Sequence, residues 1–256
     1  LRRRTIDSIT KALPSSLATV RSTIIKKRLK MTEFETNEQR TQAYMKSFNR
    51  ERVLKHLLKE KELLIFDVGA NNGLSLLEFK SWWPNSTIHC FEPQQECWDE
   101  LESRAVRYAS ESVFINKVGV GAKESEALTF YTHDITTGQS GFNRLNTHSR
   151  DSIQLHNLAD SKQGLVDYKD SINHKRTVPV TRLDKYVHNN KIKSINLLKI
   201  DTQGYEPEVL AGLGNFLSNV DVVISELMFY DFYERTLSFS DIEQYLIPAG
   251  FRLYDI

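Results

Sequence analysis

The sequence predicts an α/β fold of the doubly wound type, with a mostly parallel sheet and an N-terminal helical extension. From residue 62 onward, short runs rich in Ile, Val, Leu and Phe alternate with segments of helical period. This alternation is typical of a parallel sheet covered by helices on both faces. The segment 62–256 has the size of one doubly wound nucleotide-binding domain. We therefore expect a helical extension over 1–61 and one sheet-containing domain over 62–256.

The strands and helices of this domain are expected from two different periodicities. Apolar runs bounded by turn residues indicate strands, and apolar residues spaced three or four apart indicate helices. Because the two kinds of segment alternate, each pair of strands is separated by a crossover long enough for parallel pairing. The expected strands are 63–68, 87–91, 113–117, 195–200 and 220–226, and the expected helices are 73–81, 94–104, 207–212 and 241–249.

The helical extension is strongly basic. Residues 1–30 contain nine Lys and Arg against one Asp, although the net charge of the whole chain is only +1. Apolar residues from Leu13 to Leu29 recur at helical spacing and predict an amphipathic basic helix, and a second helical stretch is expected over 36–61. Such a helix either lies on an anionic lipid surface or packs against its own domain or a second subunit, and packing is the commoner case. Peripheral membrane contact through 1–30 and a homo-oligomer both stay open.

Composition excludes several classes of protein. The 34 Lys and Arg nearly balance the 33 Asp and Glu, so no overall positive charge favours a nucleic-acid partner. Two cysteines, Cys90 and Cys97, are too few for a disulfide framework or a structural zinc site. The apolar runs are far shorter than the roughly 20 residues that a membrane-spanning helix needs. We therefore expect a cytoplasmic protein that contacts a membrane at its surface at most.

A long polar tract at 132–175 interrupts the expected domain. Tracts of this length inside a compact domain are usually lids or binding loops. Within the tract, the turn-rich segment 138–143 is the candidate for substrate contact. Tyr230, Phe232 and Tyr233 follow the last expected strand and are aromatic candidates for contact with a substrate at the entrance of the site.

A glycine turn links the first expected strand to the following helix. Asp67 ends the strand, where its carboxylate can accept hydrogen bonds from a ligand or from loop amides. Gly69 allows close approach of the backbone to a ligand, and Gly73 allows the next helix to pack tightly. Open α/β sheets bind ligands at this end of their strands. The spacing fits neither the G-x-G-x-x-G of dinucleotide-binding domains nor the G-x-x-x-x-G-K-[ST] of phosphate-binding loops. Both of these functions are therefore disfavoured.

A carboxylate also ends the second expected strand. Glu92 precedes Pro93 and stands about 20 residues after the glycine turn, which is the position of an acid that accepts hydrogen bonds from ribose hydroxyls. Asn116 ends the third expected strand at the same edge of the sheet.

Charged residues gather at the ends of the last two expected strands. Lys199 and Asp201 alternate with apolar residues, so both side chains point to one face at the carboxyl edge of the sheet. Glu206 lies near the start of the next helix, and Glu226 ends the last strand. Acids and a lysine gathered at one site shift each other's pKa values, which suits a general base for an alcohol proton. A Lys–Asp ion pair with a capping Glu explains the same residues equally well.

Together these segments resemble the FkbM family of S-adenosylmethionine-dependent methyltransferases, which has the Rossmann-like class I methyltransferase fold. The matching stretches occur in the family's order and cover about 62–256. They are F-D-V-G-A-N-N-G (66–73), F-E-P (91–93), V-P-V-T-R-L-D (178–184), L-K-I-D-T-Q-G-Y-E (198–206), S-E-L (225–227) and G-F-R-L-Y (250–254).

The resemblance implies S-adenosylmethionine as the cofactor and assigns residues to its parts. The turn from Gly69 to Gly73 would surround the methionine part, and Glu92 would hold the ribose. Lys199, Asp201 and Glu206 would lie near the reacting methyl group. The candidate cofactor-binding residues are then Asp67, Gly69, Ala70, Asn71, Gly73, Glu92 and Asn116, and the candidate catalytic residues are Lys199, Asp201, Glu206 and Glu226.

The chain departs from the family pattern in three places. Thr202-Gln203-Gly204 stands where an acidic residue and a glycine commonly follow the strand aspartate, so one charge of the usual site is absent. Family members usually continue past the strand at 250–251 into a further hairpin strand, which predicts either a cut chain or a sheet completed differently. The basic segment 1–30 lies outside the match.

The function expected from the resemblance is O-methylation of a hydroxyl on a sugar or natural-product-like acceptor, with a small molecule or glycan as the partner. Asp201 or Glu206 would be the base, with Lys199 in support and no metal ion required. One alternative is metal-assisted methyl transfer, with Asp201 and Glu226 as oxygen ligands. Another is a non-catalytic binding module tethered by its basic arm. RNA methylation is disfavoured because the body of the chain is acidic and lacks an aromatic-basic stripe.

Overall fold

The computed structural model describes residues 39, 42–44, 49–59, 62–134, 136–149, 168–228 and 230–254. The chain forms two compact units, 1–56 and 57–256, which are described separately. Helix α3 (Arg50–Leu57) begins next to Asn49, whose side chain accepts a hydrogen bond from the amide of Arg52 at 2.7 Å. The helix expected over 36–61 therefore ends at Leu57. The amphipathic basic helix and the membrane contact expected within 1–30 lie outside the described residues.

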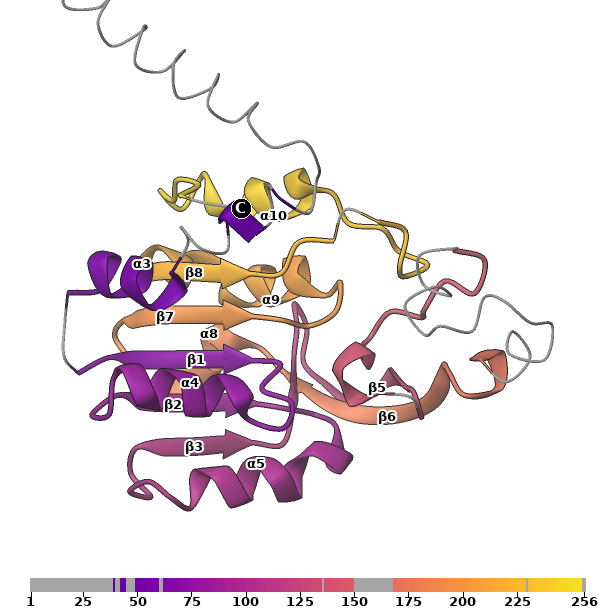
Figure 1. Ribbon diagram of the computed structural model, residues 1–256, viewed down its shortest axis with the longest axis horizontal. Coiled ribbons are helices and arrows are strands. Elements are labelled where there is room, and N and C mark those ends of the chain that lie inside the picture. Colours follow the sequence, from indigo (N-terminus) through magenta and orange to yellow (C-terminus); the bar gives the residue numbers. More distant parts are fainter. Residues whose placement is uncertain are drawn as a thin grey trace, which may run out of the picture. The chain divides into compact units, whose positions relative to one another are not determined.

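The centre of the second unit is a five-stranded parallel sheet (Figure 1). The residues of its three inner strands are mostly buried, as their apolar runs predict, whereas those of the two outer strands are largely only partly buried. The strand bounds agree with the expected ones to within two residues, and the α/β prediction is confirmed. In spatial order the strands are β3 (Val113–Asn116), β2 (Thr87–Phe91), β1 (Leu64–Val68), β7 (Ile195–Ile200) and β8 (Val220–Ser225).

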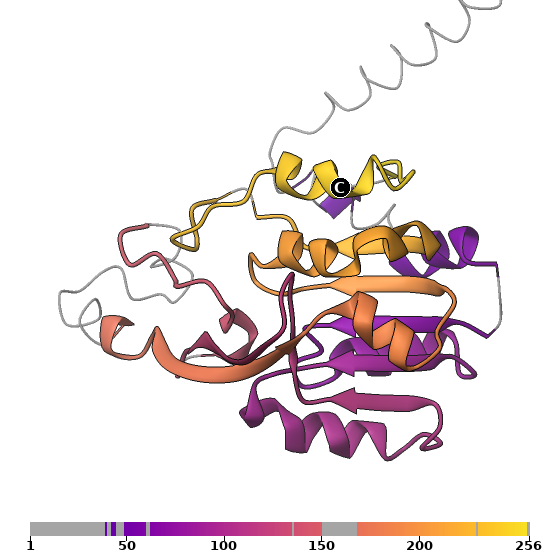
Figure 2. The ribbon, with the colours of Figure 1, turned by 180° about the vertical axis from the view of Figure 1, so that it is seen from behind.

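Helices cover both faces of this sheet. One face carries α4 (Leu74–Trp82) and α5 (Trp98–Ala105), and the opposite face carries α8 (Leu183–Asn189) and α9 (Glu206–Leu213) (Figures 1 and 2). The main apolar core joins α8, α9 and α10 (Phe239–Leu246) to the sheet. Short 3-10 turns at Gln95–Cys97 (η3) and Gly214–Asn219 (η5) precede α5 and β8.

A second, three-stranded sheet was not expected from the sequence. It consists of β4 (Gly119–Val120), β6 (His174–Thr181) and β5 (Ser125–Thr132), with β5 antiparallel to β6. The predicted polar tract 132–175 therefore ends inside a strand, since β6 begins at His174. Exposed Glu, Lys and Arg side chains on β5 and β6 hide the alternation by which strands are recognised in a sequence.

The strand order reverses between β1 and β7. The chain leaves β1 toward β2 on one side, whereas β7 and β8 lie on the other side. Such a switch point opens a crevice at the carboxyl ends of the two central strands. β5 and β6 extend from this end of the sheet, as Figure 1 shows. The topology therefore places a site between the main sheet and the second sheet.

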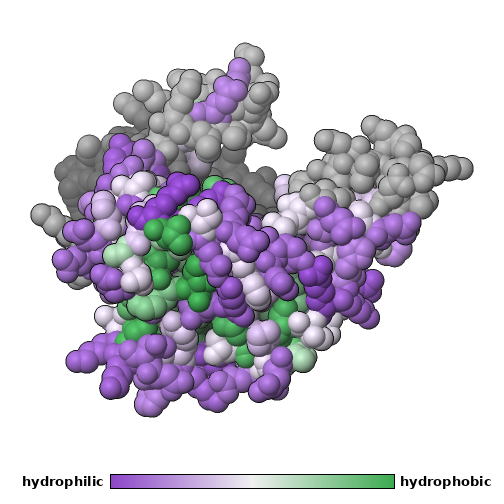
Figure 3. Space-filling view, turned by 90° about the horizontal axis from the view of Figure 1, so that it is seen from below, coloured by the Kyte–Doolittle hydropathy of each residue, from purple (hydrophilic) through white to green (hydrophobic). Residues whose placement is uncertain are grey.

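The outer strand β3 leaves apolar surface exposed. Phe114 on this strand is 41% exposed, and Val106, which follows α5, is more exposed still. The view from this side shows a band of hydrophobic residues between hydrophilic rims (Figure 3).

At the other edge of the sheet, the prediction of a strand at 250–251 is wrong, because residues 251–254 adopt no regular secondary structure. No helix in the described ranges is long and apolar enough to span a bilayer.

Candidate functional site

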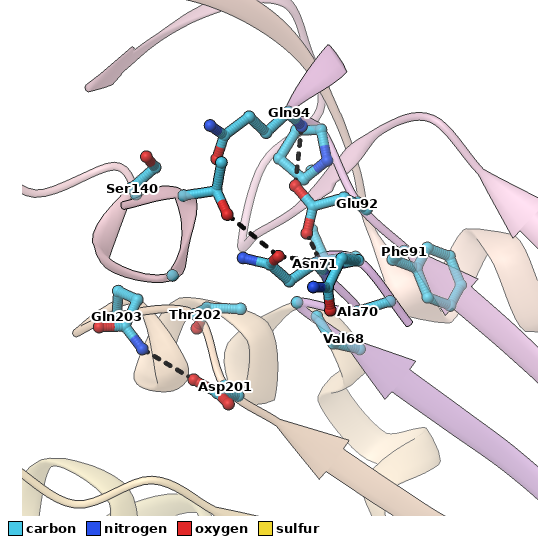
Figure 4. Close-up of a pocket in the computed structure, with 18 of the residues that line it drawn as sticks. Val68, Ala70, Asn71, Phe91, Glu92, Gln94, Ser140, Asp201, Thr202 and Gln203 are labelled. Atoms are coloured by element: carbon cyan, nitrogen blue, oxygen red, sulfur yellow. Dashed lines mark hydrogen bonds between the residues drawn. The ribbon is translucent and has the colours of Figure 1, made fainter. Parts of the chain in front are cut away.

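A cavity of about 450 Å³ lies at the carboxyl ends of β1, β2 and β7. A volume of this order is typical of a pocket for a small-molecule ligand. Segment 136–142 of the polar tract closes one side of the cavity, and the ends of β1, β2, β7 and β8 form the others. The charged residues that line the cavity are Glu92, Lys199, Asp201 and Glu226. Figure 4 shows Glu92 on one side and Asp201 with Gln203 on the other.

Gly69 allows β1 to end directly against β7. Its φ of +82° is a conformation that side chains rarely adopt, and an added Cβ would lie 1.9 Å from the carbonyl oxygen of Asp201. Gly69 also lines the cavity. The backbone of Asp201 therefore requires a glycine at this position, and the absence of a side chain also leaves room for a ligand in the cavity.

Gly73 serves helix packing and does not line the cavity. It has a φ of +86°, and an added Cβ would lie 2.8 Å from Leu101 of α5. The structure therefore supports tight packing of the helix at Gly73. Ala70 and Asn71 line the cavity, and contact of all three residues with a cofactor stays a prediction.

Glu92 is 5% exposed and closes the β2 side of the cavity. Its two carboxylate oxygens accept hydrogen bonds from the amides of Asn71, at 2.7 Å, and Gln94, at 2.8 Å (Figure 4). Burial raises the pKa of Glu92 to about 7, although these hydrogen bonds act in the opposite direction. The glycine turn and the β2 end are thus joined through one carboxyl group. Gln94 is a contact that the sequence analysis did not identify.

Asn116 lies behind Glu92 and does not line the cavity. Its side-chain amide donates to the carbonyl of Cys90 at 3.1 Å, and its backbone carbonyl accepts from the amide of Glu92 at 3.0 Å. Asn116 therefore supports the end of β2 that carries Glu92, and a direct contact of Asn116 with a cofactor stays a prediction.

Asp67 and Lys199 form a buried ion pair across neighbouring strands. They are register partners on β1 and β7, and Lys199 Nζ lies 3.0 Å from an Asp67 oxygen and 3.5 Å from Asp201 Oδ2. Burial lowers the pKa of Lys199, but the charges of Asp67 and Asp201 and their hydrogen bonds outweigh it and hold the pKa above its usual value. Asp67 is fully buried and does not itself line the cavity, but it holds the ammonium of Lys199, which does. Its part in cofactor binding stays a prediction.

Glu206 is a buried cap of the turn that follows β7. Its Oε1 accepts from the amide of Thr202 at 2.9 Å, from the Thr202 hydroxyl at 3.2 Å and from the amide of Gly204 at 3.2 Å. It does not line the cavity. These bonds to Oε1 agree with the capping interpretation, and a role of Glu206 as a base stays a prediction. Asp201, whose side chain is 40% exposed, is the other base candidate and lines the cavity.

Gln203 connects the acids at the ends of β7 and β8. Its Nε2 donates to Asp201 Oδ1 at 2.8 Å and to Glu226 Oε2 at 2.9 Å. The hydroxyl of Tyr233 donates to Gln203 Oε1 at 2.7 Å and also lies 3.0 Å from the carbonyl oxygen of Gln139. Tyr233 is therefore buried under the site, whereas Tyr230 is exposed. The sequence signalled Gln203 only as a departure from the family pattern.

The turn-rich segment 138–143 borders the cavity, as its composition led us to expect. Gly138, Ser140, Gly141 and Phe142 line it. The segment is fastened at both ends, because the Thr137 hydroxyl donates to the side chain of Asn71 at 3.2 Å and the Asn143 side chain donates to the Gly204 carbonyl at 2.7 Å. Its contact with a substrate stays a prediction.

In the described part of the chain, no three His, Cys, Asp or Glu side chains are grouped as metal ligands.

A known protein family matches the part of the chain that contains these strands and turns. Residues 67–253 match the model of the methyltransferase FkbM domain, which is most of the chain. The chain belongs to the FkbM methyltransferase family. The matched range of this FkbM domain runs from Asp67 through the cavity to the segment after α10.

The curated proteins similar to this FkbM domain include two methyltransferases. Methyltransferase 1 of Beauveria bassiana is 29% identical over 167 residues, which is 64% of each chain. The 31-O-demethyl-FK506 methyltransferase FkbM of Streptomyces tacrolimicus is 29% identical over 159 residues, which is 59% of each chain. The chain thus spans less than two thirds of the length of these relatives. A crystal structure of methyltransferase FkbM from Methylobacillus flagellatus has 15% identity and a TM-score of 0.38, covering 62% of this chain and 30% of that one.

Proposed function

We propose that this FkbM domain binds S-adenosylmethionine in the 450 Å³ cavity and transfers the methyl group to a hydroxyl of a small-molecule or glycan acceptor. The observation that carries the proposal is Glu92, a buried carboxylate at the end of β2 that faces the cavity opposite Asp201. Family membership supplies the reaction class.

The charges of the cavity fit a cationic ligand. Three acids, Glu92, Asp201 and Glu226, line it against the single ammonium of Lys199, which already pairs with the buried Asp67. When bound, S-adenosylmethionine supplies a methyl group on a positively charged sulfur. Opposite charge within a few ångström stabilises such a ligand in a partly desolvated site. The donor set of this cavity therefore fits the cofactor.

Glu92 has the capacity to bind two further donors. A carboxylate offers about four lone pairs, and the amides of Asn71 and Gln94 use two of them. The other two are available to a pair of hydroxyls such as those of a ribose. The backbone amides hold the carboxylate in one orientation before the ligand arrives, which reduces the entropy lost on binding.

Asp201 is the residue placed to accept the acceptor's proton. It lines the cavity, and its Oδ2 lies 3.5 Å from Lys199 Nζ. In this proposal the hydroxyl oxygen gains the methyl group, its proton passes to Asp201, and the sulfur is left as a neutral thioether. The relative from Streptomyces tacrolimicus supports an oxygen acceptor, because its name states that it methylates 31-O-demethyl-FK506.

Titration with S-adenosylhomocysteine by calorimetry tests the cofactor. We expect 1:1 binding to the wild-type protein, and we expect Glu92→Ala to weaken it by about 1–3 kcal/mol, because hydrogen-bonding groups of the ligand lose their partner. Glu111→Ala removes an exposed acid that does not line the cavity, and it serves as the control. A folded wild-type protein that does not bind the ligand contradicts the proposal.

The affinity for S-adenosylhomocysteine is expected to rise with pH. In the protein without ligand, Glu92 has a pKa of about 7, so it is largely protonated at pH 6. Ribose hydroxyls, in contrast, donate hydrogen bonds to its ionised form. Binding therefore releases a proton, and the affinity should increase about tenfold between pH 6 and pH 8. Calorimetry in two buffers of different ionisation enthalpy measures both effects. Glu92→Gln should reduce the increase, and an affinity that falls with pH would count against the assignment.

A further inference from the structure

We propose that the outer edge of β3 is a self-association surface, on which β3 of a second copy of this chain pairs antiparallel across a two-fold axis. The five-stranded sheets of the two copies would then join into one continuous sheet. An unpaired edge strand presents a row of backbone donors and acceptors, and a second strand can add to them. The residues of β3 do not line the cavity, so this surface is independent of the proposed function.

The outer edge of β3 has no neighbouring strand in the described part of the chain, since β3 pairs with β2 alone. The other outer strand, β8, lies beside residues 250–254, which border a common cavity with it. Sheet edges in native proteins are commonly protected by proline, by a bulge or by a charged residue. β3 is short, but its sequence V-F-I-N contains no proline and no charge, and its register with β2 is regular.

The backbone groups of Val113 and Ile115 point away from β2. The carbonyls of Ser112 and Asn116 accept hydrogen bonds from amides at β2, at 2.9 and 3.0 Å. Successive residues of a strand direct their N–H and C=O groups to opposite edges, so Val113 and Ile115 present theirs outward. In an antiparallel dimer these two residues exchange both hydrogen bonds when Val113 of one copy faces Ile115 of the other.

This register is self-complementary in side chains as well as in backbone groups. It places Phe114 of one copy opposite Phe114 of the other, as the close, non-hydrogen-bonded pair at the two-fold axis. It also places Glu111, which precedes the strand, opposite Lys117 of the second copy. Opposite charges that face each other across two strands stabilise the pairing, and like charges destabilise it. A shift of two residues in either direction would instead set a charged residue against Val113 or Ile115.

The surface around this edge is apolar at its centre. Phe114 is 41% exposed and stacks on the imidazole of His89, with ring centroids 4.6 Å apart. Val106, in the turn before β3, is 79% exposed. Figure 3 shows the band of hydrophobic residues on this side of the domain, between hydrophilic rims. A second copy would cover Phe114 and remove apolar area from water, which is the main favourable contribution to most protein association.

The two charged residues that flank β3 are accessible to a second copy. Glu111 is exposed, and Lys117 forms a surface ion pair with Glu102 at 2.6 Å. The side chain of Lys117 is 43% exposed, so its ammonium can also bond to a carboxylate of the second copy. Exposed ion pairs contribute little free energy individually. The charges therefore select the register, whereas the apolar contact and the hydrogen bonds between strands supply the affinity.

Sedimentation of the full chain tests the proposal. We expect an equilibrium between monomer and dimer over about 5–200 µM protein, as suits a small interface. Glu111→Lys and Lys117→Glu each turn symmetric attractive contacts into repulsive ones, so each should raise the dissociation constant about tenfold. Lys193→Glu changes the charge at an exposed position before β7 and should leave the constant unchanged. A monomer throughout this range, or a dimer that neither charge variant weakens, overturns the proposal.

A mixture of the two charge variants separates the interface from an effect on folding. When Glu111→Lys meets Lys117→Glu, every lysine at the interface faces a glutamate again. The mixture should therefore form a heterodimer with nearly the affinity of the wild-type dimer, although each variant associates weakly with itself. If the mixture associates no better than the separate variants, the antiparallel register is wrong.

Cysteine cross-linking checks the position of the two-fold axis. In the proposed register, residue 114 faces itself closely enough for a disulfide, so mild oxidation of concentrated Phe114→Cys should link two chains. Ile115→Cys should not link, because Ile115 faces Val113 of the second copy. The native Cys90 and Cys97 are both buried, and oxidised wild-type protein serves as the control. Efficient linking through position 115 and not through position 114 contradicts the register.

Discussion

Replacement of Gly69 by alanine is expected to lower the free energy of unfolding by about 3–5 kcal/mol. Two effects add. A side chain at a φ of +82° is strained, and the new Cβ would lie 1.9 Å from the carbonyl oxygen of Asp201. That oxygen belongs to the backbone, so relief of the clash requires the ends of β1 and β7 to separate. Because Asp201 N donates to Val68 O at 2.9 Å, the same movement weakens a hydrogen bond between the strands.

Urea unfolding of wild-type protein and of Gly69→Ala measures this loss. Gly250→Ala is a matched control, because Gly250 has a φ of +95° and an added Cβ there would meet no atom within 4 Å. The control should lose only the backbone contribution, about 1–2 kcal/mol. Equal losses in the two variants would show that the contact with Asp201 is unimportant.

Replacement of Lys199 by methionine is the second change with a large expected effect. Asp67 is fully buried and lies 3.0 Å from Lys199 Nζ. Methionine has a similar length but no charge, so the Asp67 carboxylate would stay in the core without its cation. Removal of one partner of a buried ion pair typically costs about 3–5 kcal/mol. We expect a loss of this size in urea unfolding at neutral pH.

A double variant separates the effect of the charge from that of packing. Asp67→Asn combined with Lys199→Met removes both charges, so it should recover at least part of the stability lost in Lys199→Met. Lys123→Met, at an exposed position, should change stability little. If the double variant is less stable than Lys199→Met alone, the buried Asp67 charge is not the source of the loss.

The elements of the main sheet could be predicted from the sequence because they are encoded locally. Strands β1 and β7 consist mostly of apolar residues, since both faces of a parallel strand are buried. The glycines after β1 and the carboxylate after β2 then mark the ligand-binding end of the sheet. Glu92 does face the cavity there. Strands β5 and β6 were missed because their exposed charged residues interrupt the pattern that local reasoning uses.

The neighbours of individual side chains could not be predicted in the same way. Asn116 and Glu206 end or follow strands at the same edge as Glu92 and Asp201, yet both are directed into backbone groups behind the cavity. Which carboxyl group is capped and which is open depends on the conformation of a turn, and the turn after β7 contains a residue at positive φ, Gln203. Sequence spacing does not specify that conformation.

Hydrophobic period and glycine turns act over a few residues, so the fold class, the family, the edge of the sheet that carries the site and the position of Glu92 could be predicted locally. Which acids face the cavity depends instead on the packing of the folded chain. The links from Lys199 to Asp67 and from Tyr233 through Gln203 to Asp201 and Glu226 join residues far apart in the chain. Such contacts depend on distances of a few ångström that arise only when β1, β7 and β8 pack together, and so these side chains acquire their roles on folding.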